Sequence, residues 1–225
     1  MYARTYLAEL LGTFLFMMIG YGSVAAISNA SVPAPNLLVV PFSFGLGLLA
    51  AIFSFGHISG GHFNPAVTVA MILDRRTPAA AGVGYIIAQI IGAIAAAVVI
   101  YLTVSQQAVA AGITKPGAGI SDISALALEI IFTAIFLLVI LISSNRSPGL
   151  AALAIPFTLV AIHFAIATLS GSSVNPARSI GSALVGGDLS QLWIYIVGPV
   201  IGGIIGFGIY KVADAEVPAA AERVG

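Results

Sequence analysis

The stretch SGGHFNPAVT, residues 59–68, places groups that break helices inside an otherwise apolar sequence. A near copy, SGSSVNPARS, occupies residues 170–179. Asparagine caps the free amides at a helix start, and proline fits the first helical position because that position needs no donor. Each stretch therefore predicts a break in the backbone followed by a new helix, beginning at Asn64 in the first copy and at Asn175 in the second.

The composition around these breaks is that of a membrane protein. Of the 225 residues, 60% are hydrophobic and 7% are charged, whereas a soluble domain carries about 25% charged residues. No charged residue lies between Glu9 and Asp74 or between Arg76 and Lys115, and each of these runs is long enough for most of two spans of about 20 residues. The formal net charge of zero argues against a nucleic-acid partner. The absence of cysteine excludes disulfides and thiolate metal sites.

The apolar runs divide into spans and half-spans. We expect an all-α integral membrane fold in which two segments, 65–73 and 176–185, are too short to cross a bilayer and form re-entrant half-helices. Six full transmembrane helices are expected at about 5–28, 37–56, 80–103, 122–143, 149–169 and 191–212.

Basic residues predict the orientation of these spans. In a six-helix layout one side holds Arg4, the pair Arg75–Arg76, Arg146 and Lys211, and the loops of the other side hold only Lys115. The positive-inside rule then places both termini, including a short tail at 213–225, in the cytoplasm. Because no clear cleavage site follows the first apolar stretch, we expect no cleaved signal peptide.

The sequence also repeats itself. YIIAQIIGAI, starting at Tyr85, resembles YIVGPVIGGI, starting at Tyr195. The two NPA stretches recur in the same order, and Glu9 and Thr13 match Glu129 and Thr133. We therefore expect one channel-like domain, 1–225, built from repeats at 1–110 and 120–215. Three spans in each repeat would insert the two halves in opposite directions, and such inverted repeats place their functional site near the midplane.

Non-helical backbone at membrane depth is tolerated only where protein or water covers it. We therefore expect the carbonyl groups of the breaks to line a wet path, together with two half-helix N-termini whose partial positive charges oppose cations. The carbonyls expected to line this path are those of Gly60, Gly61 and His62 and, by symmetry, Ser170, Gly171 and Ser172.

Two NPA boxes in register with a six-helix repeat resemble the aquaporin (major intrinsic protein) family, water-channel branch, and GHISGGHFNPAVT is similar to its bacterial aquaporin Z-like members. The resemblance spans the whole chain. It implies passive, cofactor-free permeation of water through one pore per subunit of a homotetramer in the cell membrane. The implied central constriction consists of Asn64, Pro65, Ala66, Asn175, Pro176 and Ala177, with the two asparagine side chains donating to the passing molecule.

The same resemblance implies a narrower selectivity filter nearer the outside, formed by Phe44, His163, Ser172 and Arg178. Glycerol-conducting relatives keep the Arg but have Trp near Phe44, Gly in place of His163 and an aromatic residue in place of Ser172. They also have Asp where this chain has Ser179, so the pattern favours water. Ile196 departs from the water-channel pattern and resembles the glycerol one. A channel that also passes glycerol or other small neutral solutes is therefore the alternative.

Intramembrane acids suggest proton or ion handling by default. The resemblance instead implies that Glu9 and Glu129 accept hydrogen bonds from the backbone of the breaks, and we favour this supporting role. Two other classes of protein stay open. A coupled transporter would be expected to place paired acids near the breaks, and an intramembrane enzyme would need a nucleophile or a metal cluster; the sequence shows neither pattern.

Overall fold

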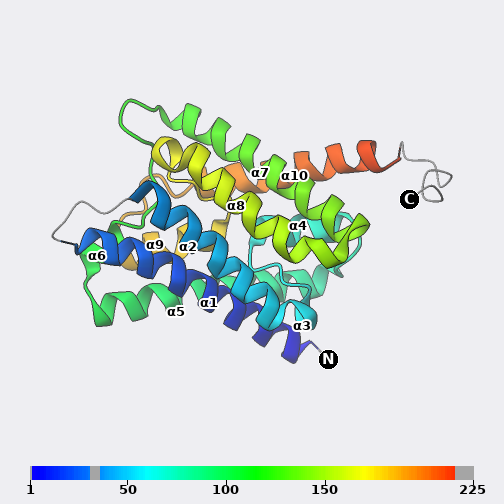
Figure 1. Cartoon of the computed structure of the whole chain (residues 1–225), viewed down its shortest axis with the longest axis horizontal. Coiled ribbons are helices and arrows are strands. Elements are labelled where there is room, and N and C mark those ends of the chain that lie inside the picture. Colours follow the sequence, from blue (N-terminus) through cyan, green and yellow to red (C-terminus); the bar gives the residue numbers. More distant parts are fainter. Residues whose placement is uncertain (1, 31–35, 216–225) are drawn as a thin grey trace.

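The computed structural model describes residues 2–30 and 36–215, and the last ten residues of the expected tail lie outside this part of the chain. Six helical segments of the described chain are long and apolar enough to cross a membrane, as the sequence predicted. Five of them are single helices: α1 (Ala3–Ser28), α5 (Ala79–Thr103), α7 (Asp122–Arg146), α8 (Pro148–Ser170) and α10 (Ile194–Ala215). The long helices run side by side along the long axis of the molecule (Figure 1).

The sixth segment changes its winding before it ends. It starts as α2 (Asn36–Ala51), continues as a π-helical turn, η1 (Ile52–Gly56), and finishes as α3 (His57–Ser59). A π-helical turn inside an α-helix often accompanies a functional site. Here it lies just before the first break, so that Ile52 and Gly56 face a cavity described below.

Two short helices begin where the sequence predicted them, α4 (Pro65–Leu73) and α9 (Pro176–Gly186). Asn64 caps α4 with its side-chain oxygen, which accepts from the amide of Ala66 at 2.9 Å. Asn175 caps α9 in the same way, accepting from Ala177 at 3.0 Å. Both caps have extended backbone, and proline follows each of them at the first helical position, as expected for strong helix starts.

Glycine lets the long helices pack closely in both halves. A Cβ added at Gly92 on α5 would lie 2.4 Å from the carbonyl oxygen of Leu10 on α1, and one at Gly202 on α10 would lie 2.4 Å from that of Ile130 on α7. Contacts this close leave no room for a side chain at either position. Small residues such as glycine therefore allow the backbones of these membrane helices to approach each other closely. Close helix contacts at Gly92 and Gly202 are therefore present in both halves.

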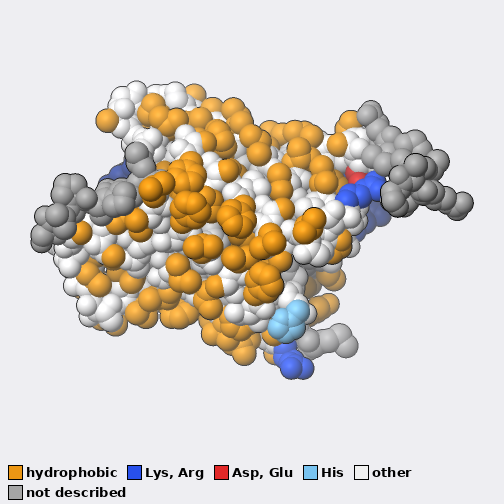
Figure 2. Space-filling model, in the orientation of Figure 1, with side chains coloured by type: hydrophobic (Ala, Val, Ile, Leu, Met, Phe, Trp, Pro, Cys, Tyr) orange, Lys and Arg blue, Asp and Glu red, His pale blue; other side chains and the backbone are white. Residues whose placement is uncertain are grey.

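The surface is largely apolar. Figure 2 shows hydrophobic side chains spread over the face in view, with lysine and arginine side chains toward its ends. Large apolar side chains such as Leu102 and Phe53 are exposed by 74% and 66%. An exposed apolar band of this extent is characteristic of a surface whose solvent is lipid.

Some elements differ from the sequence expectation. A short helix, α6 (Gln106–Ala110), occupies the expected polar loop and is capped by Ser105, whose hydroxyl accepts from the amide of Ala108 at 3.1 Å. The last long helix begins at Ile194 instead of residue 191, because the preceding residues form turns.

Candidate functional site

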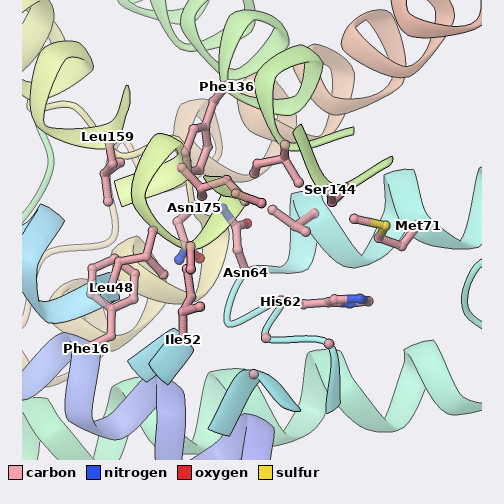
Figure 3. A pocket seen from close by; sticks show the side chains of 18 of the residues that line it. Phe16, Leu48, Ile52, His62, Asn64, Met71, Phe136, Ser144, Leu159 and Asn175 are labelled. Carbon is pink, nitrogen blue, oxygen red and sulfur yellow. The ribbon is translucent and has the colours of Figure 1, made fainter. Parts of the chain in front are cut away.

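The two breaks are joined to each other through their asparagines. The side-chain nitrogen of Asn64 donates to the carbonyl oxygen of Val174 at 2.8 Å, and that of Asn175 donates to the carbonyl oxygen of Phe63 at 2.9 Å. A primary amide has two hydrogens on its nitrogen. Each asparagine therefore keeps one donor after bracing the opposite break, and both residues line the same cavity (Figure 3).

A buried carboxylate supports the first break. Glu9 accepts from the amides of His62 at 3.0 Å and Phe63 at 2.7 Å. It also accepts from the hydroxyl of Ser59 at 2.6 Å and from the side-chain amide of Gln89 at 2.7 Å. Both carboxylate oxygens are thus occupied by donors from the protein, which satisfies amides that a break in a helix leaves unpaired.

The second break has the same kind of support. Glu129 accepts from the amides of Ser173 at 2.9 Å and Val174 at 2.8 Å, and from the hydroxyl of Ser170 at 2.8 Å. Like Glu9, Glu129 is fully buried. Burial of a polar group is costly without hydrogen bonds. By accepting these hydrogen bonds, Glu129 holds the non-helical backbone of the second break in place.

Backbone angles show which residues of the two breaks are equivalent to each other. Gly60 and Gly171 both have left-handed φ values, 93° and 83°, and the next residues, Gly61 and Ser172, have 68° and 47°. By these matching angles, the residue of the second break that is equivalent to Gly60 is Gly171 and not Ser170. The symmetry expectation for the second set of carbonyls was therefore one residue early.

Ser170 has a different role from the one expected. Its carbonyl oxygen accepts from the hydroxyl of Tyr195 at 2.7 Å, just as that of Ser59 accepts from Tyr85 at 2.9 Å. Both serines end the helix before a break and are tied to a tyrosine of a neighbouring long helix. The carbonyls matching Gly60, Gly61 and His62 are consequently those of Gly171, Ser172 and Ser173.

A cavity of about 220 Å³ contacts the asparagine pair. Its wall contains Gly60, Gly61 and His62 from the first break and the apolar side chains of Phe136 and Leu159 from α7 and α8. Figure 3 shows the ring of His62 pointing away from the asparagines. The wall is mostly apolar with a few polar groups, as in other sites for small molecules.

A second cavity, of about 630 Å³, lies farther along the same helices. On α8 the first cavity contacts residues 148–159, whereas the second contacts residues 163–168 and the glycine that follows the helix, Gly171. The second cavity also contacts Arg178 and Lys115. The asparagine pair and Arg178 therefore belong to two cavities that follow one another along the bundle.

Three of the four expected filter residues meet beside the second cavity. The rings of Phe44 and His163 are stacked with centroids 4.9 Å apart. The guanidinium carbon of Arg178 lies 5.2 Å from the centre of the Phe44 ring, within the range of a cation–π contact. Ser172 is fully buried, and its hydroxyl has no hydrogen-bond partner.

Three polar atoms in this group have no hydrogen-bond partner within the protein. Nδ1 of His163 lies 3.0 Å from the carbonyl oxygen of Leu159, so in the neutral ring Nδ1 carries the hydrogen and Nε2 can accept. Nε2 of His163 and Nε of Arg178 are buried without a partner. Unpaired buried polar atoms are rare, and here they accompany the unpaired hydroxyl of Ser172.

One partner of Arg178 was not foreseen from the sequence. Its Nη1 donates to the carbonyl oxygen of Gly112 at 2.7 Å, which fixes the guanidinium against the loop that follows α6. A backbone carbonyl carries no side-chain signal, so no sequence pattern could have identified this contact. Among the described residues, no group of three or more His, Asp or Glu side chains is arranged to hold a metal ion.

The family model for major intrinsic protein matches residues 1–210. The chain belongs to the major intrinsic protein family. The resemblance seen in its two NPA boxes is thereby confirmed, and with it a multi-pass membrane protein. Aquaporin Z of Photorhabdus laumondii is 42% identical over 95% of this chain and 98% of the relative. Aquaporin Z of Rhodopseudomonas palustris is 39% identical over 100% of this chain and 99% of the relative.

Another relative of this major intrinsic protein has a different name. The glycerol uptake facilitator protein-like 6 of Lactiplantibacillus plantarum is 40% identical over 95% of this chain and 99% of the relative. The X-ray structure of the aquaglyceroporin from Plasmodium falciparum has a TM-score of 0.85 and covers 96% of this chain and 100% of its own. Its sequence identity is 23%, so this likeness shows the shared fold alone.

Proposed function

We propose that this major intrinsic protein is a passive water channel. The observation that carries the proposal is the succession of two cavities along the helices, one contacting the Asn64–Asn175 pair and the other contacting Arg178 and His163. Each contact point offers free donors or acceptors beside apolar walls. Such a path exchanges hydrogen bonds with water without trapping it, as permeation requires. The two relatives called Aquaporin Z support this reading.

We further propose that the path excludes protons and other cations. The helices α4 and α9 begin at the asparagine pair, so two partial positive charges meet where the breaks face each other. The buried guanidinium of Arg178 adds a full charge beside the second cavity. All three charges oppose a cation at the places where the path is polar.

Glu9 and Glu129 support a channel over an ion-coupled transporter. Every oxygen of the two carboxylates already accepts a hydrogen bond from the protein. A carboxylate that carries ions or protons needs to exchange partners during transport. We therefore propose that both acids are structural and that the protein neither couples flux to ions nor performs chemistry.

The surroundings of the channel are also proposals. The basic residues Arg75, Arg76, Arg146 and Lys211 predict that the end of the bundle holding them faces the cytoplasm, with the protein in the plasma membrane. We propose the inverted repeats, at 1–110 and 120–215 within a single channel domain, from the internal sequence repeat. We propose a homotetramer with one pore per subunit from the family resemblance.

Glycerol is the second candidate permeant. It is favoured by the relative called glycerol uptake facilitator protein-like 6 and by Ile196. Against it stands the stacked pair of Phe44 and His163 beside Arg178, because an imidazole there fills space that a carbon chain would need. We therefore propose water as the main permeant.

Osmotic shrinkage of proteoliposomes tests this proposal. Wild-type vesicles are expected to shrink much faster than empty vesicles under a sucrose gradient, and to re-swell slowly in glycerol. Arg178→Val opens the ring of filter residues and is expected to speed re-swelling in glycerol. If wild-type vesicles shrink no faster than empty ones, the water-channel proposal fails; if wild-type vesicles re-swell rapidly in glycerol, the second candidate takes its place.

A further inference from the structure

A chain of buried hydroxyl groups runs from the loop after α6 to the second break. The hydroxyl of Thr114 lies 2.7 Å from that of Ser179, which lies 2.6 Å from that of Ser173. The hydroxyl of Ser173 is in turn 2.9 Å from the carbonyl oxygen of Asn175. All three hydroxyl side chains are at most 3% exposed.

Counting hydrogens fixes the direction of this chain. Each hydroxyl has one hydrogen to donate, and a carbonyl oxygen can only accept, so Ser173 donates its hydrogen to Asn175. Ser179 must then donate to Ser173, which leaves Thr114 as the donor to Ser179. Thr114 is therefore the one external donor at the start of the chain.

The first half of the protein shows what this donor replaces. Thr68 holds the position in α4 that Ser179 holds in α9, and it receives a hydrogen bond from the side-chain amide of Gln89 at 2.9 Å. The residue matching Gln89 in the second repeat is Pro199, which has no donor at all. Thr114 supplies from a loop the hydrogen bond that the long helix cannot supply.

The loop that carries Thr114 is itself fixed in place. Its Gly112 accepts from Arg178 at 2.7 Å, and its Gly117 donates to the carbonyl oxygen of Leu169 at 2.7 Å. A Cβ at Gly171 would lie 3.0 Å from the Cα of Thr114, so the loop packs directly on the second break. This loop therefore makes two hydrogen bonds beside the filter, one with the guanidinium of Arg178 and one with the hydroxyl of Ser179.

We propose that Thr114 is a positioning residue for the selectivity filter. It holds Ser179, and through it the flanking Arg178 and the backbone of Asn175, in the arrangement that discriminates between water and larger solutes. This inference rests on the proposed channel function and adds a determinant of its selectivity. Thr114 does not line either of the two cavities described above, so it acts through its neighbours.

Three threonine variants test this role in proteoliposomes. Thr114→Val keeps the shape of the side chain and removes the donor, whereas Thr114→Ser keeps the donor. The control is Thr158→Val, because the hydroxyl of Thr158 bonds only to Ala154 in its own helix, α8. We expect Thr114→Val to conduct water nearly as wild type does but to lower the water-to-glycerol permeability ratio about fivefold, the equivalent of one hydrogen bond. Thr114→Ser and Thr158→Val should keep the wild-type ratio.

Amide hydrogen exchange gives a second readout that does not depend on permeation. In Thr114→Val, exchange should become faster in a peptide covering residues 173–182 and stay unchanged in the matched peptide covering 62–71. An unchanged ratio with unchanged exchange overturns the inference, and so does a serine variant that behaves like valine. Loss of both permeabilities together with faster exchange in both peptides would mean a general structural role and would also overturn it. If wild type conducts no water, the channel proposal fails while the exchange comparison still decides the role of Thr114.

Discussion

The side-chain amide of Asn64 donates a hydrogen bond to the carbonyl oxygen of Val174, the residue just before Asn175. The reciprocal bond runs from Asn175 to Phe63. Each asparagine therefore does three things: its oxygen caps a helix, one amide hydrogen braces the opposite break, and the other hydrogen is left for the cavity. The two breaks are therefore joined to each other by two reciprocal hydrogen bonds.

Replacing Asn64 by aspartate separates these roles. Asn64→Asp keeps the oxygen that caps α4 but loses the donor to Val174 and faces its carbonyl with a second acceptor. We expect stability against denaturant to fall by about 1–3 kcal/mol, the usual cost of a buried polar group left unpaired, and water permeability to fall with it. Asn29→Asp, at the exposed end of α1, is the control and should change both far less. Equal effects of the two substitutions would contradict the bracing role.

The two buried acids should be similarly sensitive to amide substitution. In Glu129→Gln the new amide group cannot accept from the backbone, so one of the amides of Ser173 and Val174 is left unpaired, at about 1–3 kcal/mol. In Glu9→Gln the amide of His62 or Phe63 is left unpaired in the same way. Turning the side-chain amide of Gln89 would restore neither backbone bond and would break its own bond to Thr68.

Thermal unfolding of the two variants in the same detergent measures this loss. Both variants are expected to unfold at a lower temperature than wild type, by similar amounts. A variant as stable as wild type would refute the supporting role of the acid concerned. If either substitution changed the rate at which a pH gradient decays in vesicles, the acid concerned would be a proton carrier and not a support.

Two glycines of α10 form a matched pair for testing helix packing. A methyl group at Gly202 would meet the carbonyl oxygen of Ile130 at 2.4 Å, whereas one at Gly208 would meet nothing within 4 Å. Gly202→Ala should therefore cost about 1–3 kcal/mol through overpacking. Gly208→Ala should gain roughly 0.5–1 kcal/mol, because alanine is the better helix former. Melting temperatures that move in the same direction for both variants would contradict the close contact of α7 with α10.

Much of this arrangement was predictable because membrane burial and helix capping leave clear marks in a sequence. The starts of α4 and α9 were placed correctly from Asn-Pro alone, since capping is a local interaction. Uncharged runs gave the six spans for a similar reason. Glu9 and Glu129 could be assigned a supporting role only through the family resemblance, because acids in an apolar segment by default suggest proton or ion handling.

The remaining features depend on contacts between distant residues. The carbonyl of Gly112 binds Arg178, but a glycine in a loop gives no hint of which cation it will meet. Ser170 was assigned to the path by mistake, since the aligned NPA stretches already match Gly60 with Gly171, and the left-handed backbone of Gly171 agrees with that alignment. Thr114 was overlooked because its partner lies in another part of the chain.

The ion pair at the second cavity makes a prediction about pH. Lys115 binds Asp188 at 2.7 Å, and this hydrogen bond holds the pKa of Asp188 well below its usual range. A lowered pKa gives stabilisation that is complete above the ordinary value of about 3.9 and is lost only as the pH falls through the lowered one. We therefore expect the loop around Lys115, and the water-to-glycerol ratio, to be unchanged between about pH 5 and pH 8.

Permeability ratios measured across that pH range in wild type and Asp188→Asn check this expectation. The variant removes the carboxylate and leaves Lys115 without its partner. A pH-dependent ratio in wild type that disappears in Asp188→Asn would show that the pair titrates in the physiological range, contrary to the prediction.

The central claim is that one path carries water and excludes protons. It is tested most directly by following volume and internal pH in the same wild-type vesicles under simultaneous osmotic and pH gradients. The account predicts that the vesicles shrink far faster than empty ones while the pH gradient decays no faster than in empty ones. Rapid decay of the pH gradient, or shrinkage at the rate of empty vesicles, would contradict it.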